Sequence, residues 1–344
     1  MYLSDNGFRN KEIIMSESEN FKVAVVGGGS SGVMAALRGV LNNDQVVLYT
    51  GSAKAKKKSR ALWVGKVENM PGHLDYKKGI VNPSMETLKW IASSPFASLL
   101  TQVKSSVSEI IKNSNGTFTV KDEKGGEETV FAVVLATGVM DVQPNIGGSI
   151  EPILPFANVQ LVDYCIRCDG HHVLGKKTSI IGGGDGAAWV AILLKERYDV
   201  ADMTIITNGD KQEFSEEIKK LISAYEIKVE YSPISEVNGN HKELRLDGFV
   251  LEDETLVASD IAFVSLGMIV YNELAKSLEL ELDERGFVKT HKLSESSVEN
   301  VYAVGDLQAG KKNQIYTGWD IAVDAMDSIN SKKRRMRREK ILNS

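Results

Sequence analysis

The chain has 344 residues, of which 42% are hydrophobic and 25% charged, and its net charge is −5 at pH 7. This composition is typical of a globular protein and excludes a disordered or fibrous one. No apolar run approaches the roughly 20 residues that span a bilayer, and residues 1–20 lack the apolar core of a signal peptide. Two cysteines are too few for a disulfide-rich secreted scaffold. We therefore expect a cytoplasmic protein of about two domains with no membrane partner.

The N-terminal region predicts a β-turn-α-β unit. A β-branched strand at 21–26 leads into the turn GGGSSG at 27–32. An Ala-rich helix to about Arg38 and a second strand at 46–49 follow. In the dinucleotide-binding fingerprint the first glycine makes a tight turn, the second admits a pyrophosphate and the third allows close helix–strand packing. Gly27, Gly29 and Gly32 occupy these positions, so phosphates are expected at the N-terminus of the helix.

Two basic clusters interrupt an otherwise acidic chain. The first contains Lys54, Lys56, Lys57, Lys58 and Arg60, and the second is KKRRMRREK at 332–340. They form either a solvated loop and a solvated tail or a docking surface for an acidic partner, because clustered charge steers association. No aromatic residues interleave with them and no nucleic-acid-binding module is recognisable, so no nucleic-acid partner is expected.

The β-turn-α-β pattern returns in the second half of the chain. A strand at 178–181 precedes GGGDGA at 182–187, a helix to about Arg197 and a strand at 203–207. The apolar runs that follow the two units are expected to be buried parallel strands that return to the nucleotide crevice: 132–138, 261–267 and 300–307. The runs at 117–122 and 242–253 have polar turns and predict antiparallel strands.

Both cysteines lie in one motif, with Cys165 and Cys168 at C-x-x-C spacing and Asp169 directly after. This spacing permits a redox-active disulfide, in which a thiol of lowered pKa attacks as the thiolate. The alternatives are two incidental buried cysteines or a metal site completed by His171 and His172. Adjacent histidines are, however, expected to point apart unless the backbone bends, and to lie at the surface. Asp169 is expected to act as general acid and base, or else to cap a helix or turn.

The order of motifs resembles that of the low-molecular-weight thioredoxin reductases. The motifs that carry this resemblance are VENMPG at 67–72, LATG at 135–138, CxxCDG at 165–170, GGGD at 182–185 and VGDL at 304–307. The match covers roughly residues 20–330. It implies an FAD-dependent homodimer that reduces a thioredoxin-like protein, with an inserted domain that swings between the flavin and that partner.

The resemblance implies an α/β fold with two Rossmann-like, three-layer ββα dinucleotide-binding domains, the second inserted into the first. The expected division is a polar leader, a split FAD-binding domain, an inserted pyridine-nucleotide-like domain with the C-x-x-C disulfide and a basic tail: 1–20, 21–142 with 272–330, 143–271 and 331–344. Cys168 is then expected to face the flavin, Cys165 to attack the partner disulfide and Asp169 to move the proton.

The same resemblance implies which residues bind FAD. They come from the first glycine turn, from single positions at Arg60 and Asn69, from the LATG and VGDL motifs, and from the start of the last helix. The predicted set is Gly27, Gly29, Ser30, Ser31, Gly32, Arg60, Asn69, Ala136, Thr137, Gly138, Gly305, Asp306, Asn313, Gln314 and Ile315. No resident metal is expected. Asn313 replaces an arginine of the family, and Trp319 either stacks near the flavin or packs in the core.

The second nucleotide site departs from the family pattern. A basic segment that grips the 2′-phosphate of NADPH is replaced by TNGD at 207–210, which has no arginine and adds an acid. The family's acidic pair near the nicotinamide aligns with Trp189 and Val190, and Gly186 replaces a Ser or Thr. NADPH is therefore a doubtful donor, and ferredoxin, which is acidic, suits the basic clusters better. Two alternatives stay open: an NAD(P)H-dependent thioredoxin reductase with altered nucleotide contacts, and a non-catalytic flavin and disulfide redox sensor.

Overall fold

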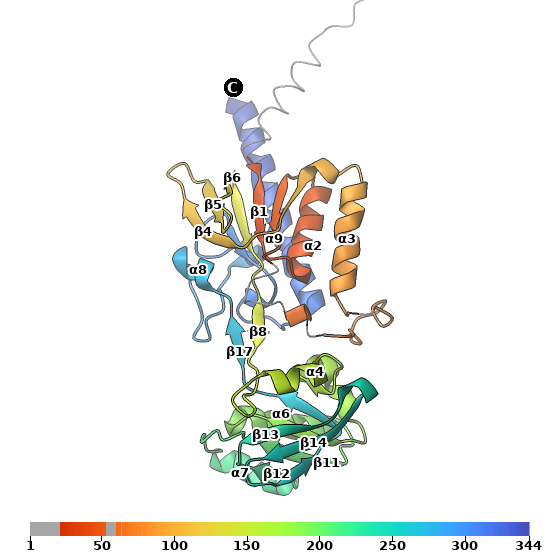
Figure 1. The fold of residues 1–344 in the computed structure, drawn as a ribbon. Coiled ribbons are helices and arrows are strands. Elements are labelled where there is room, and N and C mark those ends of the chain that lie inside the picture. Colours follow the sequence, from red (N-terminus) through yellow and green to blue (C-terminus); the bar gives the residue numbers. More distant parts are fainter. Residues whose placement is uncertain (1–20, 53–59, 63, 77, 344) are drawn as a thin grey trace, which may run out of the picture. The chain divides into compact units, whose positions relative to one another are not determined.

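The computed structural model describes residues 21–52, 60–62, 64–76 and 78–343 (Figure 1). The predicted leader 1–20, the lysines at 54–58 and Ser344 lie outside the described residues. The chain divides into two compact units. Unit 1 comprises residues 1–61, 81–140 and 270–344, and unit 2 comprises residues 62–80 and 141–269.

Unit 1 is built on a five-stranded parallel sheet in the order β18-β7-β1-β2-β3. The strands are β1 (Val23–Val26), β2 (Val46–Tyr49), β3 (Leu100–Val103), β7 (Ala132–Leu135) and β18 (Val301–Ala303). Four of these strands are buried at every position, which explains their continuous apolar sequences, since a parallel strand is covered on both faces. The strands predicted at 21–26, 46–49, 132–138 and 300–307 are confirmed, the second with the predicted bounds and the others with shorter ones.

Helices cover one face of this sheet, and an antiparallel sheet covers the other (Figure 1). The covering helices are α2 (Ser30–Leu41), α3 (Val81–Ser93) and α9 (Ile315–Asn343), whereas the short α8 (Glu273–Ser277) packs on the side of the antiparallel sheet. The antiparallel sheet consists of β4 (Val107–Lys112), β5 (Phe118–Asp122) and β6 (Glu127–Val130). Its Phe118 and Val120 pack against Ala24 of β1, whereas Ala35 of α2 packs on the opposite face. The predicted three-layer arrangement and the antiparallel run at 117–122 are confirmed.

The C-terminal helix α9 is longer than the sequence led us to expect. Residues 331–343, predicted as part of a separate basic tail at 331–344, continue this helix. Residues 334–343 are exposed, but Lys333 is buried and its Nζ lies 2.5 Å from Oδ1 of the buried Asp44. The basic segment is therefore anchored at its start by an ion pair with the loop after α2.

Unit 2 repeats the plan of unit 1 with a parallel sheet in the order β12-β11-β10-β16-β9. The strands are β9 (Val162–Asp163), β10 (Lys177–Ile181), β11 (Asp202–Ile206), β12 (Lys228–Glu230) and β16 (Ile261–Val264). The helices are α4 (Leu154–Ala157), α5 (Ile166–Asp169), α6 (Gly184–Arg197) and α7 (Glu216–Ala224). An antiparallel sheet of β13 (Ile234–Asn240), β14 (Arg245–Leu251) and β15 (Leu256–Ala258) completes the unit. The second predicted β-turn-α-β unit is confirmed, as are the strand at 261–264 and the antiparallel run at 242–253.

The chain passes between the units within β8 (Val139–Asp141) and again within β17 (Met268–Val270). These two short strands pair with each other. The changes of unit at 140/141 and 269/270 lie two residues from the predicted boundaries at 142/143 and 271/272. Residues 62–80 were expected in the flavin domain, but their contacts group them with unit 2. Within the described residues, no helix is long and apolar enough to cross a membrane.

Candidate cofactor and disulfide sites

The first glycine turn lies between β1 and α2 of unit 1 and requires glycine at two positions. Gly27 has φ +123°, and a Cβ there would lie 2.3 Å from the carbonyl oxygen of Ala136. A Cβ on Gly32 would lie 1.8 Å from the oxygen of Gly27. The turn therefore allows β1, β7 and α2 to approach as closely as a dinucleotide site needs. Gly29 precedes the helix as its N-cap, Ser30 begins it, and no acidic residue occupies its first turn.

Three predicted flavin-binding segments converge on this turn. Oγ of Ser31 lies 2.7 Å from the position of a Cβ on Gly305 and 2.3 Å from that of a Cβ on Gly318. Asp306 follows in the same short 3₁₀-helix, and its Oδ2 lies 3.9 Å from Nη1 of Arg60. The glycine turn, the VGDL motif and helix α9 thus meet at the carboxyl edge of the parallel sheet, where nucleotides bind in such folds.

The segment that leads into α9 holds one buried donor without a partner. Among the described residues, Nδ2 of Asn313 is a buried donor without a hydrogen-bond partner. Gln314 is buried, and its side chain donates to the oxygen of Asn313 at 3.0 Å. Ile315 begins the helix, and its first turn contains no acid. A buried orphan donor at a positive helix end fits a bound group that carries negative charge, as reduced flavin does.

The remaining predicted flavin-site residues lie in two places. The Thr137 hydroxyl donates to the oxygen of Tyr271 at 2.6 Å, and Gly138 has φ +67° at the end of the LATG motif in unit 1. Asn69 belongs to residues 62–80 and is thereby grouped with unit 2. Trp319, for which stacking near the flavin and packing in the core were both considered, is half-buried.

Replacement of Gly32 tests the flavin cradle. We expect Gly32→Ala to lose bound FAD, because its Cβ would overlap the oxygen of Gly27 and push α2 away from β1. Flavin absorbance of the purified protein measures the loss, and far-UV circular dichroism shows whether the chain is folded. Gly186→Ala in the first turn of α6 is the matched control, because a Cβ at Gly186 meets no atom within 4 Å. Full flavin content in a folded Gly32→Ala variant would contradict this cradle.

The second glycine turn lies between β10 and α6 of unit 2, and side chains of the chain itself lie against its glycines. A Cβ on Gly183 would lie 2.5 Å from Oδ2 of Asp210, and one on Gly184 would lie 2.4 Å from the side-chain carbon of Gln212. Gly183 is the N-cap of α6, and Asp185 lies in the first turn of that helix. The Asp210 carboxylate and the Gln212 amide therefore lie over the helix N-terminus, where a pyrophosphate would bind in a working nucleotide site.

Cys165 and Cys168 form a disulfide at the start of α5, with their Cα atoms 5.3 Å apart. Cys165 is the N-cap residue of this short helix, and the backbone N–H of Cys168 lies 3.2 Å from its Sγ. Both cysteines are partly exposed, and Asp169, the next residue in the chain, is buried. The predicted pairing is confirmed, and the metal site that would use both sulfurs together with the histidines is not formed.

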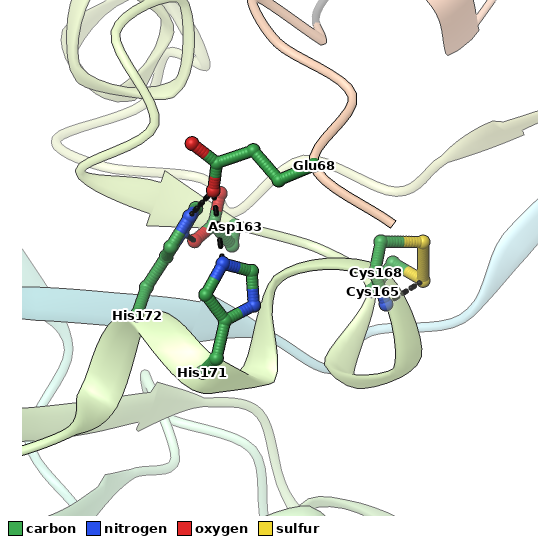
Figure 2. Close-up of polar contacts among 6 residues, drawn as sticks. All are labelled: Glu68, Asp163, Cys165, Cys168, His171 and His172. Atoms are coloured by element: carbon green, nitrogen blue, oxygen red, sulfur yellow. Dashed lines mark hydrogen bonds and ion pairs between the residues drawn. A yellow bond between two sulfur atoms is a disulfide. The ribbon is translucent and has the colours of Figure 1, made fainter. Parts of the chain in front are cut away.

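A cluster of imidazoles and carboxylates lies one turn after the disulfide (Figure 2). Nε2 of His171 and Nε2 of His172 lie 2.9 and 2.8 Å from Oε2 of Glu68. Nδ1 of His172 lies 2.8 Å from Oδ2 of the buried Asp163 at the end of β9. The adjacent histidines were expected to point apart unless the backbone bends, and here the 3₁₀-helix Gly170–Val173 brings their rings to a centroid distance of 4.4 Å. The surface position predicted for His172 is wrong, since only 16% of its side chain is exposed.

The charges of this cluster follow from its hydrogen bonds. Because Asp163 and Glu68 face the two nitrogens of His172, both nitrogens donate and the ring is an imidazolium. The hydrogen bond to Asp163 is the main reason why the pKa of His172 is raised to about 9. Burial raises the pKa of Asp163, whereas the hydrogen bonds from His172 and His171 lower that of Glu68. We assign the proton shared by Asp163 and His172 to the imidazole, because its other nitrogen also faces a carboxylate.

Comparison with protein families matches residues 21–328 to the pyridine nucleotide-disulphide oxidoreductases. The chain belongs to this family. Its curated relatives include the thioredoxin reductases of Bacillus subtilis, 24% identical over 88% of this chain and 92% of the relative, and of Treponema pallidum, 26% identical over 87% and 92%. The family predicted from the motif order is confirmed, and the chain is a flavoprotein disulfide oxidoreductase of the thioredoxin reductase type.

Solved structures agree with this family's fold. The thioredoxin reductase of Streptococcus pyogenes superimposes with a TM-score of 0.78 at 19% identity, over 92% of this chain and 99% of that one. A putative thioredoxin reductase of Bacillus anthracis gives a TM-score of 0.76 at 20% identity, over 92% and 99%. At this identity the likeness supports the two Rossmann-like domains of the predicted fold class.

Glu68 and Asp163 were not predicted as functional residues from the sequence, although Glu68 lies in the VENMPG motif. Glu68 and His171 are 103 residues apart, and no local pattern joins them. The doublet His171-His172 was the one available signal, because two adjacent imidazoles rarely lack polar partners when the chain around them is buried.

Proposed function

We propose that this protein is an FAD-dependent thiol–disulfide oxidoreductase that passes electrons from flavin to the Cys165–Cys168 disulfide and then to a thioredoxin-like protein, as a homodimer. The observation that carries the proposal is the partly exposed disulfide at Cys165 and Cys168, in a chain whose other unit has a glycine cradle suited to a dinucleotide. Bound FAD would supply two-electron reducing power to the disulfide. The proposal requires unit 2 to present that disulfide to the flavin.

The residues around the disulfide support a division of roles between its sulfurs. The N–H of Cys168, 3.2 Å from Sγ of Cys165, would stabilise a thiolate on Cys165. Reduction of the disulfide takes two electrons and two protons. The buried Asp169, next to Cys168 in the chain, would act as general acid and base and transfer one of these protons. Cys165 then attacks a partner disulfide to form a mixed disulfide. Cys168 resolves it, which releases the partner as a dithiol and restores Cys165–Cys168.

NADPH is not the efficient donor in this proposal. Asp210 and Gln212 lie over Gly183 and Gly184, and a pyrophosphate would have to displace them and bind beside a carboxylate. A one-electron carrier such as ferredoxin needs no such site, because two reduced molecules can deliver the two electrons in turn. An acidic carrier would be attracted to basic surface such as residues 334–338, where four arginines are exposed.

An anaerobic titration with a panel of donors tests this choice. We expect reduced ferredoxin to bleach the flavin absorbance within the assay, and NADPH and NADH at micromolar concentrations to leave it unchanged. Rapid bleaching by NADPH or NADH would instead establish the nucleotide-dependent alternative. A chemically reduced protein that reduces no thioredoxin would favour the redox sensor.

A variant at Asp210 shows whether its carboxylate blocks the nucleotide. Asp210→Asn keeps the shape of the side chain and removes its charge, so NADPH is expected to bind more tightly than to the parent protein, as measured by equilibrium titration. Asp253→Asn, an exposed acid in the turn between β14 and β15, is the matched control and should leave NADPH binding unchanged. Equal NADPH affinity in the Asp210→Asn variant and its parent would contradict this explanation.

A further inference from the structure

We propose that Glu68, His171 and His172 form a binding site for a divalent transition-metal ion, with Asp163 holding His172 in the liganding orientation. All four residues belong to unit 2. The proposed site uses neither sulfur of the disulfide, so it is distinct from the arrangement of cysteines and histidines considered above. It does not depend on the donor or partner of the enzyme.

Three potential ligand atoms converge from two chain segments that are distant in sequence (Figure 2). Nε2 of His171, Nε2 of His172 and one carboxylate oxygen of Glu68 all lie within 4.8 Å of one another. Donors about 2.1 Å from one tetrahedral ion are about 3.4 Å apart. The two contacts of Glu68, at 2.9 and 2.8 Å, need to open by only about half an ångström to admit an ion at these bond lengths. The ion would replace the protons that now join the imidazoles to the carboxylate.

The hydrogen bond between His172 and Asp163 resembles the one that a metal-ligating histidine makes with its outer-shell partner. A metal-ligating histidine donates its other N–H to a carboxylate or carbonyl, which fixes its tautomer and ring orientation. Asp163 accepts this hydrogen bond from Nδ1 of His172 at 2.8 Å, and it is itself only 4% exposed. Nε2 is therefore the nitrogen of His172 that is directed at the proposed ion.

Charge and access also suit a metal ion. Glu68, Asp163 and the buried Asp169 place three carboxyl groups around the imidazoles, so a dication would be attracted to the cluster. The side chains of His171 and Glu68 are 48% and 29% exposed, which leaves the ligand atoms a route to solvent. Two imidazoles in a set of three donors favour Zn²⁺, Fe²⁺ or Co²⁺ and disfavour Mg²⁺ and Ca²⁺, which prefer oxygen. Three protein ligands leave a position for water.

The test is the binding of Zn²⁺ and Co²⁺ to the FAD-loaded, oxidised full chain after treatment with a chelator. We expect one equivalent of either ion per chain by calorimetry, and a Co²⁺ absorption band at wavelengths beyond the flavin spectrum. His172→Ala should weaken binding by more than about 100-fold, since even loss of an outer-shell partner costs about 10–100-fold. Asp163→Asn should fall within that outer-shell range. Glu68→Gln, at a partly exposed position, tests the third ligand if His172→Ala does not fold.

Two controls separate this site from other sources of metal affinity. His291→Ala, an exposed histidine of unit 1, should bind the ion as the parent does. Cys165→Ser/Cys168→Ser should retain the one equivalent, because no thiolate is required. No stoichiometric binding of Zn²⁺ or Co²⁺, unchanged affinity in His172→Ala and Glu68→Gln, or loss of binding in the double cysteine variant would each overturn the proposal. None of these results bears on disulfide reduction by the parent protein.

Discussion

Replacement of either cysteine by serine should abolish thioredoxin reduction and leave FAD bound. We expect turnover of Cys165→Ser and of Cys168→Ser to fall by at least about 10³-fold, because a serine hydroxyl is neither a thiolate nucleophile nor half of a disulfide. The flavin cradle belongs to unit 1 and the disulfide to unit 2, so flavin content should equal that of the parent protein. Steady-state reduction of a thioredoxin, with a donor that bleaches the flavin, measures the effect.

The two serine variants also distinguish the roles of the sulfurs. Cys168→Ser keeps the Cys165 thiol but has no resolving thiol, so it should accumulate a mixed disulfide with an oxidised partner. This species is visible on a non-reducing gel and disappears with dithiothreitol. Cys165→Ser should trap far less. Trapping by Cys165→Ser in place of Cys168→Ser would reverse the assigned roles, and full activity of either variant would refute the proposed function.

Asp44→Asn should lower the free energy of unfolding by about 3–5 kcal/mol, because it leaves the buried Lys333 ammonium without its partner. The side chains of Lys333 and Asp44 are only 4% and 3% exposed, so water cannot replace the lost carboxylate. Urea unfolding followed by circular dichroism measures the change. Asp44→Leu/Lys333→Met should recover most of the loss, since a well-packed apolar pair replaces both buried charges.

The deficit of Asp44→Asn should shrink as pH rises. Burial lowers the pKa of Lys333 below its usual 10.5, because its effect is larger than the opposing attraction of Asp44. Loss of Asp44 should lower this pKa further. The cost of the unpaired charge is therefore full below the folded-state pKa and diminishes as pH rises through that value toward the unfolded-state pKa. Glu339→Gln, in an exposed pair with Arg335, should change stability by no more than about 0.5 kcal/mol. A deficit in Asp44→Asn no larger than this would show that the ion pair is not needed.

The elements that sequence patterns predicted well are those governed by local constraints. The strands at 132–135 and 261–264 are apolar at every position because both faces of a parallel sheet are covered. Gly27 and Gly182 have φ values of +123° and +154°, which residues with a Cβ rarely adopt. The C-x-x-C spacing likewise limits how far apart two sulfurs can lie. These features can be predicted without knowing where residues distant in the sequence lie.

The features that the sequence did not reveal depend on pairs that are distant in the chain. Lys333 had the sequence context of a solvated basic residue, and only the approach of α9 to the loop after α2 buries it against Asp44. Glu68 meets the two histidines because residues 62–80 pack with unit 2. The carboxylate of Asp210 was visible as an added acid, but its place over Gly183 comes from the loop after β11.

The sequence by itself determined the family, the repeated strand-turn-helix plan and the disulfide pair, because glycine sterics, strand burial and short cysteine spacing are local properties. The tertiary structure alone decided which charges are buried, which carboxylate occupies the second helix N-terminus and which side chains gather around His172. Those outcomes depend on desolvation and on distances of a few ångströms between segments that are not neighbours in sequence, such as Glu68 and His171, which lie 103 residues apart. No pattern of neighbouring residues encodes such distances.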